Sequence, residues 1–199
     1  MKVGVVRETY PGEQRVALVP GVLAGLKKAK LEVLIEAGAG LAAGFPDQDY
    51  VDKGATVLAD RGQVLAQADV LLQVRSLGAN LKDGRADLVA MHPGQTVIGM
   101  AEPLTEVGAA RQLAERGINL FAMELIPRIT RAQSMDVLSS MASIAGYKAV
   151  LLAADALPKM FPMMMTAAGT IAPAKVFVIG AGVAGLQAIA TARRLGAVV

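Results

Sequence analysis

Short apolar runs alternate with amphipathic, helix-like segments along residues 1–126. The runs do not alternate polar with apolar positions, which is typical of strands buried on both faces of a parallel sheet. A helix-like segment, PGVLAGLKKA, separates the first two runs. We therefore expect a doubly wound α/β subdomain with a parallel sheet. The predicted strands are KVGVV, LEVLIEA, ATVLA, DVLLQV, QTVIGM and INLFAM.

One helix within this region has predictable ends. It is expected to run from about Thr105 to Arg116, with Thr105 as its capping residue and Glu106 in its first turn. Gly117 supplies the stop signal.

The pattern changes after Pro127, where residues 127–164 are expected to link two subdomains. A helical run from Ser134 to Leu157 is rich in Ala, Ser and Gly, and Ser134 is the expected cap with Asp136 in the first turn. Two arginines, a glutamine and an aspartate gather just before it, in RITRAQSMD. A linker does not need these groups, and a core does not tolerate them unpaired. Residues 158–174 are expected to form a loop.

The last segment contains three glycines in the order GxGxxG. Gly180, Gly182 and Gly185 follow the apolar run KVFVI and open the helix-like run VAGLQAIATARRLGA. Gly180 permits a tight turn, Gly182 allows a pyrophosphate to approach the backbone, and Gly185 allows close packing. Free N–H groups at the helix start face the phosphates. The sequence therefore predicts a dinucleotide site with Ala181 and Val183 beside the glycines, although a turn needed only for packing is the alternative.

Residues 165–199 are expected to be an incomplete Rossmann subdomain. A complete fingerprint has an acidic residue about 20 positions after the glycines, where it holds the ribose hydroxyls. Val199 stands before that position, so the residue that separates NAD from NADP preference is not in the chain. We expect this chain to be a fragment of a longer polypeptide, and residues 1–199 to bind NADH weakly or undetectably.

Composition excludes several classes of function. The chain has no Cys and a single histidine, His92, which excludes disulfides, thiolate nucleophiles and His- or Cys-rich metal sites. A net charge of +3 spread along the chain, with 4% aromatic residues, argues against nucleic-acid binding. The longest uncharged intervals, Lys159–Lys175 and Lys175–Arg193, contain Pro, Gly or Thr, so no membrane span is expected. Without a signal peptide, the chain is expected to be cytoplasmic.

A charged loop follows the first predicted strand. RETYPGEQRVALVP places Arg7, Glu8, Glu13 and Arg15 at the carboxyl edge of the sheet, where open α/β folds bind ligands. A solvated surface loop is an equal alternative at this stage.

Taken together, four segments resemble the alanine dehydrogenase and nicotinamide nucleotide transhydrogenase group. These are GEQRVALVP, LEVLIEAGAG, RITRAQSMDVLSSMASIAGYKAV and PAKVFVIGAGVAGLQAIATARRLGAVV. Within the group, RAQSMDVLSSMASIAGYKA and FPMMMTAAGT look like the NAD(H)-binding domain I of the alpha subunit of proton-translocating transhydrogenase. That domain is about twice as long as this chain.

The resemblance implies a role for the polar loop. In the family, an Arg, a Gln and an Asp with this spacing lie over the nicotinamide ring of NAD(H), which here implies Arg128, Gln133 and Asp136, with Ser139 one turn further and Ile129 beside them. Arg and Gln donors suit the carboxamide and phosphate oxygens, and Asp can orient either donor. The alternative is a helix cap with a surface ion pair.

Alanine dehydrogenase is the rival interpretation. Its substrate pocket resembles this chain at Arg15, but it also uses a lysine and a histidine, and these positions fall at Arg75 and near Glu102 here. His92 lies ahead of a Pro-Gly turn on the other side of a strand and is expected to be a turn residue. Arginine is a poor general acid or base. Amino-acid chemistry is therefore disfavoured.

The resemblance also implies partners. Hydride would pass directly between NAD(H) held here and NADP(H) on a partner subunit, coupled to proton movement in a separate membrane-spanning subunit, with this chain as a homodimer attached peripherally to the membrane. Met163–Met165 either pack under the loop or dock the partner. A fragment that acts only as a structural dimerisation module is the non-catalytic alternative.

Overall fold

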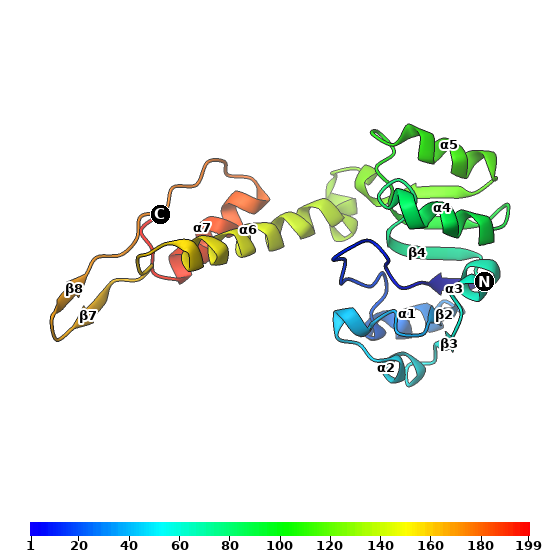
Figure 1. Cartoon of the computed structure of the whole chain (residues 1–199), viewed down its shortest axis with the longest axis horizontal. Coiled ribbons are helices and arrows are strands. Elements are labelled where there is room, and N and C mark those ends of the chain that lie inside the picture. The colour runs from blue at the N-terminus through cyan, green and yellow to red at the C-terminus, as the bar shows by residue number, and fades with distance from the viewer. The chain divides into compact units, whose positions relative to one another are not determined.

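The protein divides into two compact units, Met1–Ile126 and Pro127–Val199. A computed structural model describes all 199 residues (Figure 1). The first unit holds a parallel sheet with its helices, and the second holds two long helices, a hairpin and the glycine-rich turn.

The first unit is built on a six-stranded sheet in the order β3-β2-β1-β4-β5-β6. Every neighbouring pair is parallel. All six apolar runs form strands, so the predicted doubly wound α/β fold is confirmed. The strands are β1 (Lys2–Val5), β2 (Glu32–Glu36), β3 (Thr56–Leu58), β4 (Val70–Arg75), β5 (Thr96–Met100) and β6 (Asn119–Ala122).

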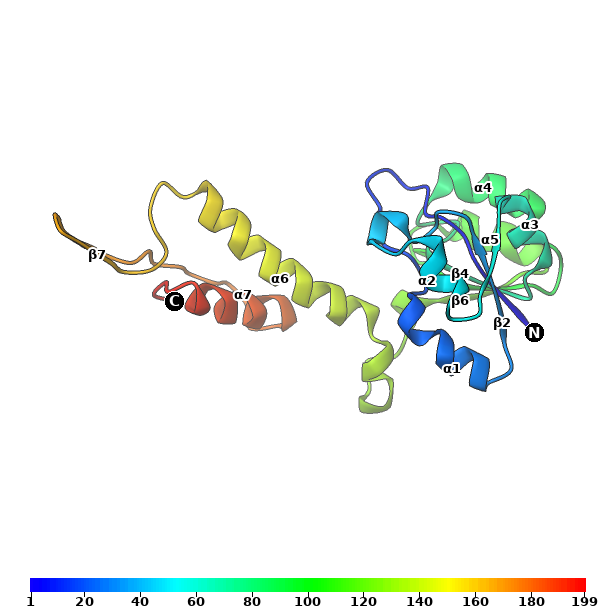
Figure 2. The same cartoon turned by 90° about the horizontal axis from the view of Figure 1, so that it is seen from below.

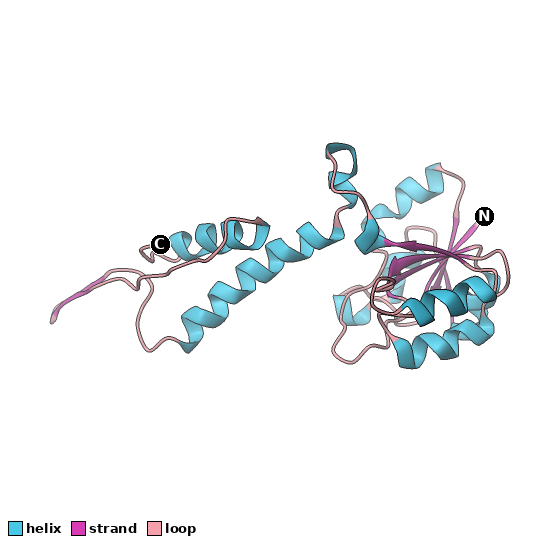
Figure 3. Cartoon of the chain, turned by 90° about the horizontal axis from the view of Figure 1, so that it is seen from above, coloured by secondary structure: helices cyan, strands magenta, loops and turns pink.

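Helices cover both faces of this sheet (Figure 3). Successive side chains of β2 alternate between two apolar clusters: Leu34 lies in one, and Val33 and Ile35 lie in the other. Both faces are therefore dry, which explains the unbroken apolar runs. The helices are α1 (Leu23–Lys28), α2 (Asp47–Val51), α3 (Arg61–Gln67), α4 (Leu81–Ala90) and α5 (Val107–Glu115).

A buried charge network joins three elements of the first unit. The Arg61 guanidinium donates to both carboxylate oxygens of Asp87, at 2.7 and 2.6 Å, and to Glu36 at 3.0 Å. Arg61 also donates to the Arg7 carbonyl at 2.6 Å, and the Arg7 N–H donates to Glu36 at 2.8 Å. The loop that follows β1 is therefore fixed to α3 and α4.

The strand order reverses between β1 and β4, so the loops that leave these strands diverge. Glu8 bridges the two, because its carboxylate accepts from the N–H groups of Val74 at 2.6 Å and Arg75 at 3.1 Å. Burial raises the pKa of Glu8, and these two backbone hydrogen bonds oppose that shift.

Glu13 joins two arginines at the same edge. Its carboxylate accepts from Arg15 at 2.7 and 2.6 Å and from Arg75 at 3.0 Å. The Arg75 guanidinium also lies 4.3 Å from the centre of the Tyr10 ring. The hydrogen bonds from the Arg15 side chain are the main reason that the pKa of Glu13 falls from 4.5 to about 2.

The predicted cap of α5 is wrong. Glu106 is the N-cap residue and makes no side-chain capping bond, while the Thr105 hydroxyl donates to the Glu102 carbonyl at 3.1 Å. Glu102 has a φ of +47°, and the turn that it begins places Thr105 outside the helix. The predicted stop is correct: Gly117 follows the helix with a φ of +69°.

In the second unit, α6 (Val137–Ala156) and α7 (Val183–Arg194) lie side by side (Figure 2). A small apolar cluster of Val150, Phe161, Ala174 and Ala192 lies between them. Residues Thr130–Met135 form a 3-10 turn ahead of α6, and Asp136, not Ser134, is the N-cap. The predicted cap is wrong because this turn precedes the helix.

Two further expectations for the second unit need correction. Residues expected to be loop form an antiparallel hairpin, β7 (Met164–Thr166) with β8 (Gly169–Ile171). The predicted strand KVFVI has only one isolated parallel bridge, Lys175 with Val198, because no further strand pairs with it. Its side chains Phe177 and Ile179 are 88% and 90% exposed.

The helix α6 is long and apolar enough to cross a membrane by length and composition, with a mean hydropathy of 1.5. The uncharged intervals in the sequence did not reveal it, because α6 includes Lys148 and Asp155. One such helix is weak support for a membrane span.

The substitution Asp87→Asn should destabilise the first unit by about 3 to 5 kcal/mol, because it leaves the Arg61 charge without its buried partner. The Asp87 side chain is 6% exposed and that of Arg61 is 22% exposed, so water replaces little of the lost interaction. Urea unfolding followed by circular dichroism measures the change. Asp83→Asn on the same helix is the control and should shift stability by about 0.5 kcal/mol or less; equal effects of both would contradict the network's role.

The substitution Glu13→Gln should remove an acid-sensitive part of the stability. A carboxyl with a depressed folded-state pKa stabilises the fold above its unfolded value, here 4.5, and loses that contribution as the pH falls toward 2. The Arg15 side chain is 41% exposed, so screening limits the effect at pH 7 to about 1 kcal/mol. Unfolding free energies at pH 7 and pH 2 test this, with Glu115→Gln as control. A difference from the wild type that persists unchanged at pH 2 would refute it.

Candidate functional site

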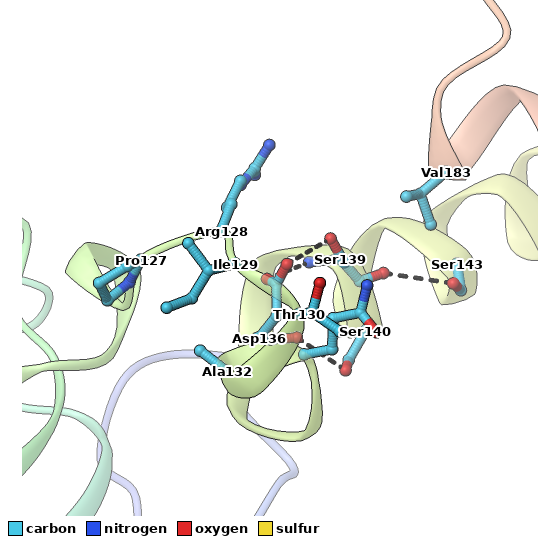
Figure 4. A pocket seen from close by; sticks show the side chains of 11 residues that line it. Pro127, Arg128, Ile129, Thr130, Ala132, Asp136, Ser139, Ser140, Ser143 and Val183 are labelled. Carbon is cyan, nitrogen blue, oxygen red and sulfur yellow. Dashed lines mark hydrogen bonds between the residues drawn. The ribbon is translucent and has the colours of Figure 1, made fainter.

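A pocket of about 710 Å³ opens at the start of α6, within the second unit (Figure 4). Four of its lining residues are those that the family resemblance implied: Arg128, Gln133, Asp136 and Ser139. The glycine-rich segment contributes Val183. The remaining lining residues are Pro127, Ile129, Thr130, Ala132, Ser140 and Ser143.

The loop before α6 presents its polar side chains to solvent. Ala132 is 5% exposed and anchors the 3-10 turn, while Arg128 and Gln133 are exposed. Figure 4 shows the Arg128 side chain extending away from Asp136 and Ser139. Hydrogen-bond donors therefore stand free at the pocket, with a short apolar anchor beneath them.

Asp136 makes its side-chain hydrogen bonds to Ser139. One carboxylate oxygen accepts from the Ser139 N–H at 2.9 Å and the other from the Ser139 hydroxyl at 2.6 Å. These bonds, the hydroxyl's first, lower the pKa of Asp136, and the Arg128 charge adds to the shift. No side-chain hydrogen bond joins Asp136 to Arg128 or Gln133, so the carboxylate acts as a helix cap in this structure. Its expected role of orienting those donors stays a prediction.

A ladder of serine hydroxyls continues from this cap along α6. The Ser140 hydroxyl donates to the Asp136 carbonyl at 2.9 Å, and the Ser143 hydroxyl donates to the Ser139 carbonyl at 3.2 Å. Ser143 is a pocket residue that the sequence pattern did not predict. Its spacing of four from Ser139, which places both on one helix face, was the signal available to find it.

The glycine turn has the geometry of an anion-binding helix start. Gly180 has a φ of +102°, which favours glycine. A Cβ at Gly185 would lie 2.0 Å from the Gly180 carbonyl oxygen, so any side chain there would displace the turn. Gly182 caps α7 and has open space around it, and the first N–H groups of α7 have no partner within the helix. The turn can therefore receive a phosphate on its backbone.

The pocket takes in only part of the predicted cofactor set. Gly180, Ala181, Gly182 and Gly185 lie outside its lining, and Val183, which is 43% exposed, is the residue of the turn that reaches it. The polar loop and the glycine turn are thus neighbouring parts of one unit that meet at Val183.

The charged edge of the first unit is internally paired. Glu13 accepts from both Arg15 and Arg75, and none of the pockets in the structure opens at this edge. His92 is exposed and precedes β5, at the amino end of the strands, where its ring nitrogens approach the carbonyls of Pro93 and Ala68 at 3.2 and 3.3 Å. It is a turn residue, as expected. No group of three His, Cys, Asp or Glu side chains is arranged to hold a metal ion.

Similar proteins are known for the whole chain. It is 46% identical over 199 residues to a segment of the NAD(P) transhydrogenase alpha subunit of Rhodospirillum rubrum, covering all of this chain and 52% of the relative. The crystal structure of transhydrogenase from Sinorhizobium meliloti matches 99% of this chain and 55% of its own with a TM-score of 0.91 and 48% identity. Alanine dehydrogenase of Mycobacterium tuberculosis is 32% identical over 208 residues, covering all of this chain and 52% of the relative.

The chain thus spans about half the length of these relatives. Residues 4–145 match the family model for "Alanine dehydrogenase/PNT, N-terminal domain", and residues 149–199 match that for the C-terminal domain. The junction of the two family domains falls inside α6, whereas the boundary between the two compact units falls after residue 126. On the match of both domains in order, the chain belongs to the alanine dehydrogenase/PNT family.

Proposed function

We propose that this chain forms the NAD(H)-binding part of a transhydrogenase, in which hydride passes directly between NAD(H) bound here and NADP(H) bound on a partner subunit. One observation carries the proposal: the polar loop before α6 and the start of α7 border a single pocket. The relatives named as transhydrogenase subunits support it, since they are more similar to this chain than the alanine dehydrogenase compared above.

The residues present fit a dinucleotide. Exposed Arg128 and Gln133 offer N–H donors suited to carboxamide and phosphate oxygens, and Ile129, which is 55% exposed, offers apolar surface for a ring. The open backbone at Gly182 and the start of α7 suits a pyrophosphate. The bound nicotinamide would supply the hydride chemistry.

The protein's own contribution would be positioning. Asp136 and Ser139 fix the first turn of α6, which holds the loop that carries Arg128 and Gln133 at a defined place. A ring held in one orientation is what direct hydride transfer requires, and no nucleophile is needed. Residues 127–164 would then form the nicotinamide-contacting and linking segment, and residues 165–199 would contribute the start of a Rossmann subdomain.

The alternative activity, amino-acid dehydrogenation, is not favoured. Glu13 already neutralises Arg15 and Arg75, so these guanidiniums are not free to hold a substrate carboxylate. The only histidine, His92, stands at the opposite end of the strands. The geometry therefore offers no proton-transfer group beside this edge.

The proposal includes partners. We infer an NADP(H)-binding subunit, a membrane-spanning subunit that carries the proton path, and a homodimer of this chain, peripheral to the membrane on the cytoplasmic side. Met163, Met164 and Met165 are 61%, 38% and 81% exposed, so this chain does not bury them and they remain a candidate docking surface. A purely structural dimerisation module is the competing hypothesis, and nucleotide binding separates the two.

The substitution Gln133→Ala should slow hydride exchange about tenfold, equivalent to about 1.4 kcal/mol, by loosening the ring's position. The measurement mixes the protein expressed from its native gene with an NADP(H)-binding transhydrogenase domain and follows transfer from NADH to an NADP analogue. Gln67→Ala, an exposed position on α3, is the control and should leave the rate unchanged. Equal rates for the wild type and Gln133→Ala would remove this residue from the site.

A parallel assay gives the same protein alone pyruvate, ammonium and NADH. We expect no oxidation of NADH, because Arg15 and Arg75 are paired with Glu13 and no histidine is nearby. Consumption of NADH without the partner domain would overturn the transhydrogenase proposal in favour of an amino-acid dehydrogenase.

A further inference from the structure

One face of α6 changes character along its length. Ser139, Ser143, Gly146 and Val150 are separated by four, three and four positions, which places them on a single stripe of the helix. Gly146 and Val150 are buried, and Val150 belongs to the apolar cluster shared with α7. Towards the start of α6 the same stripe carries the hydroxyls of Ser143 and Ser139, which line the pocket. The pocket therefore begins where the contact with α7 ends.

The contact between the two helices is closest at Gly146. A Cβ built there would lie 2.2 Å from the Ala184 carbonyl oxygen and 2.9 Å from its carbonyl carbon. Both are backbone atoms in the first turn of α7, so no flexible side chain can move aside. To restore even a 3.0 Å separation, α7 would have to move at least 0.8 Å from α6 at this point, the difference between 3.0 and 2.2 Å.

The glycine turn is joined to α7 in the same way. Gly185, the residue after Ala184, packs its Cα against the Gly180 carbonyl. A path of backbone contacts thus runs from α6 through the first turn of α7 to the glycine turn. Since alanine is the better helix former, α6 alone gains nothing from glycine at position 146.

We propose that Gly146 is a positioning residue for dinucleotide binding. It sets the distance between the glycine turn, which would receive the pyrophosphate, and the polar stripe and loop at the start of α6, which would hold the nicotinamide. This inference rests on the proposed function, because it needs one ligand to engage both places. A ligand that spans two sites binds tightly only while their separation matches its length, whereas a ligand of one site does not sense it.

The test compares a spanning ligand with a partial one. NADH would engage both places, whereas ADP-ribose lacks the nicotinamide and would engage the glycine turn alone. With the protein expressed from its native gene, we expect Gly146→Ala to weaken NADH binding at least tenfold by calorimetry and to change ADP-ribose binding less than twofold. Gly185→Ala should weaken both ligands, because it displaces the turn itself.

The matched control is Gly25→Ala on α1, an exposed helical glycine with no atom within 4 Å of an added Cβ, which should change neither ligand. If Gly146→Ala does not fold, Val150→Ala loosens the same contact one turn further along without a clash, and should also weaken NADH selectively. Loss of NADH and ADP-ribose affinity in equal measure, or unchanged NADH affinity in a folded variant, would overturn the inference. Wild-type protein that binds neither ligand would instead remove the proposed function.

Discussion

The two-sided burial of parallel strands is the constraint on which both units depend. In the first unit every strand has neighbours or helices that take up its side chains, and Leu34 and Ile35 of β2 are buried on opposite faces. In the second unit the segment before Gly180 has α7 on one face and nothing on the other, so Phe177 and Ile179 face solvent. The same sequence pattern therefore forms strands in one place and a single bridge in the other.

Charged groups at the carboxyl edge of the sheet are largely satisfied within the fold. Arg61 ties α3 to α4 and to the loop after β1, and Glu13 neutralises Arg15 and Arg75. Few of these charges remain available to a ligand. The donors that stand free, Arg128 and Gln133, lie in the second unit, which makes that unit the better place for a binding site.

Sequence pattern predicted the sheet and not the helix caps. The six strands follow from unbroken apolar runs, because a dry environment on both faces selects one residue class throughout. A cap depends on which side chain reaches a free N–H group, and the turns before α5 and α6 decided against Thr105 and Ser134. The loop residues of the pocket came from family resemblance, whereas Ser143 needed only helical spacing.

The uncovered face beside Gly180 has a practical consequence for the protein in solution. Residues 176–179 form an uncharged, β-prone segment without proline, a composition that pairs readily with strands of other chains. Pro173 and Lys175 stand just ahead of it and act as gatekeepers on one side only. Self-association through this ribbon would rise with concentration, so solubility in this form is governed by four residues and not by the net charge of the chain.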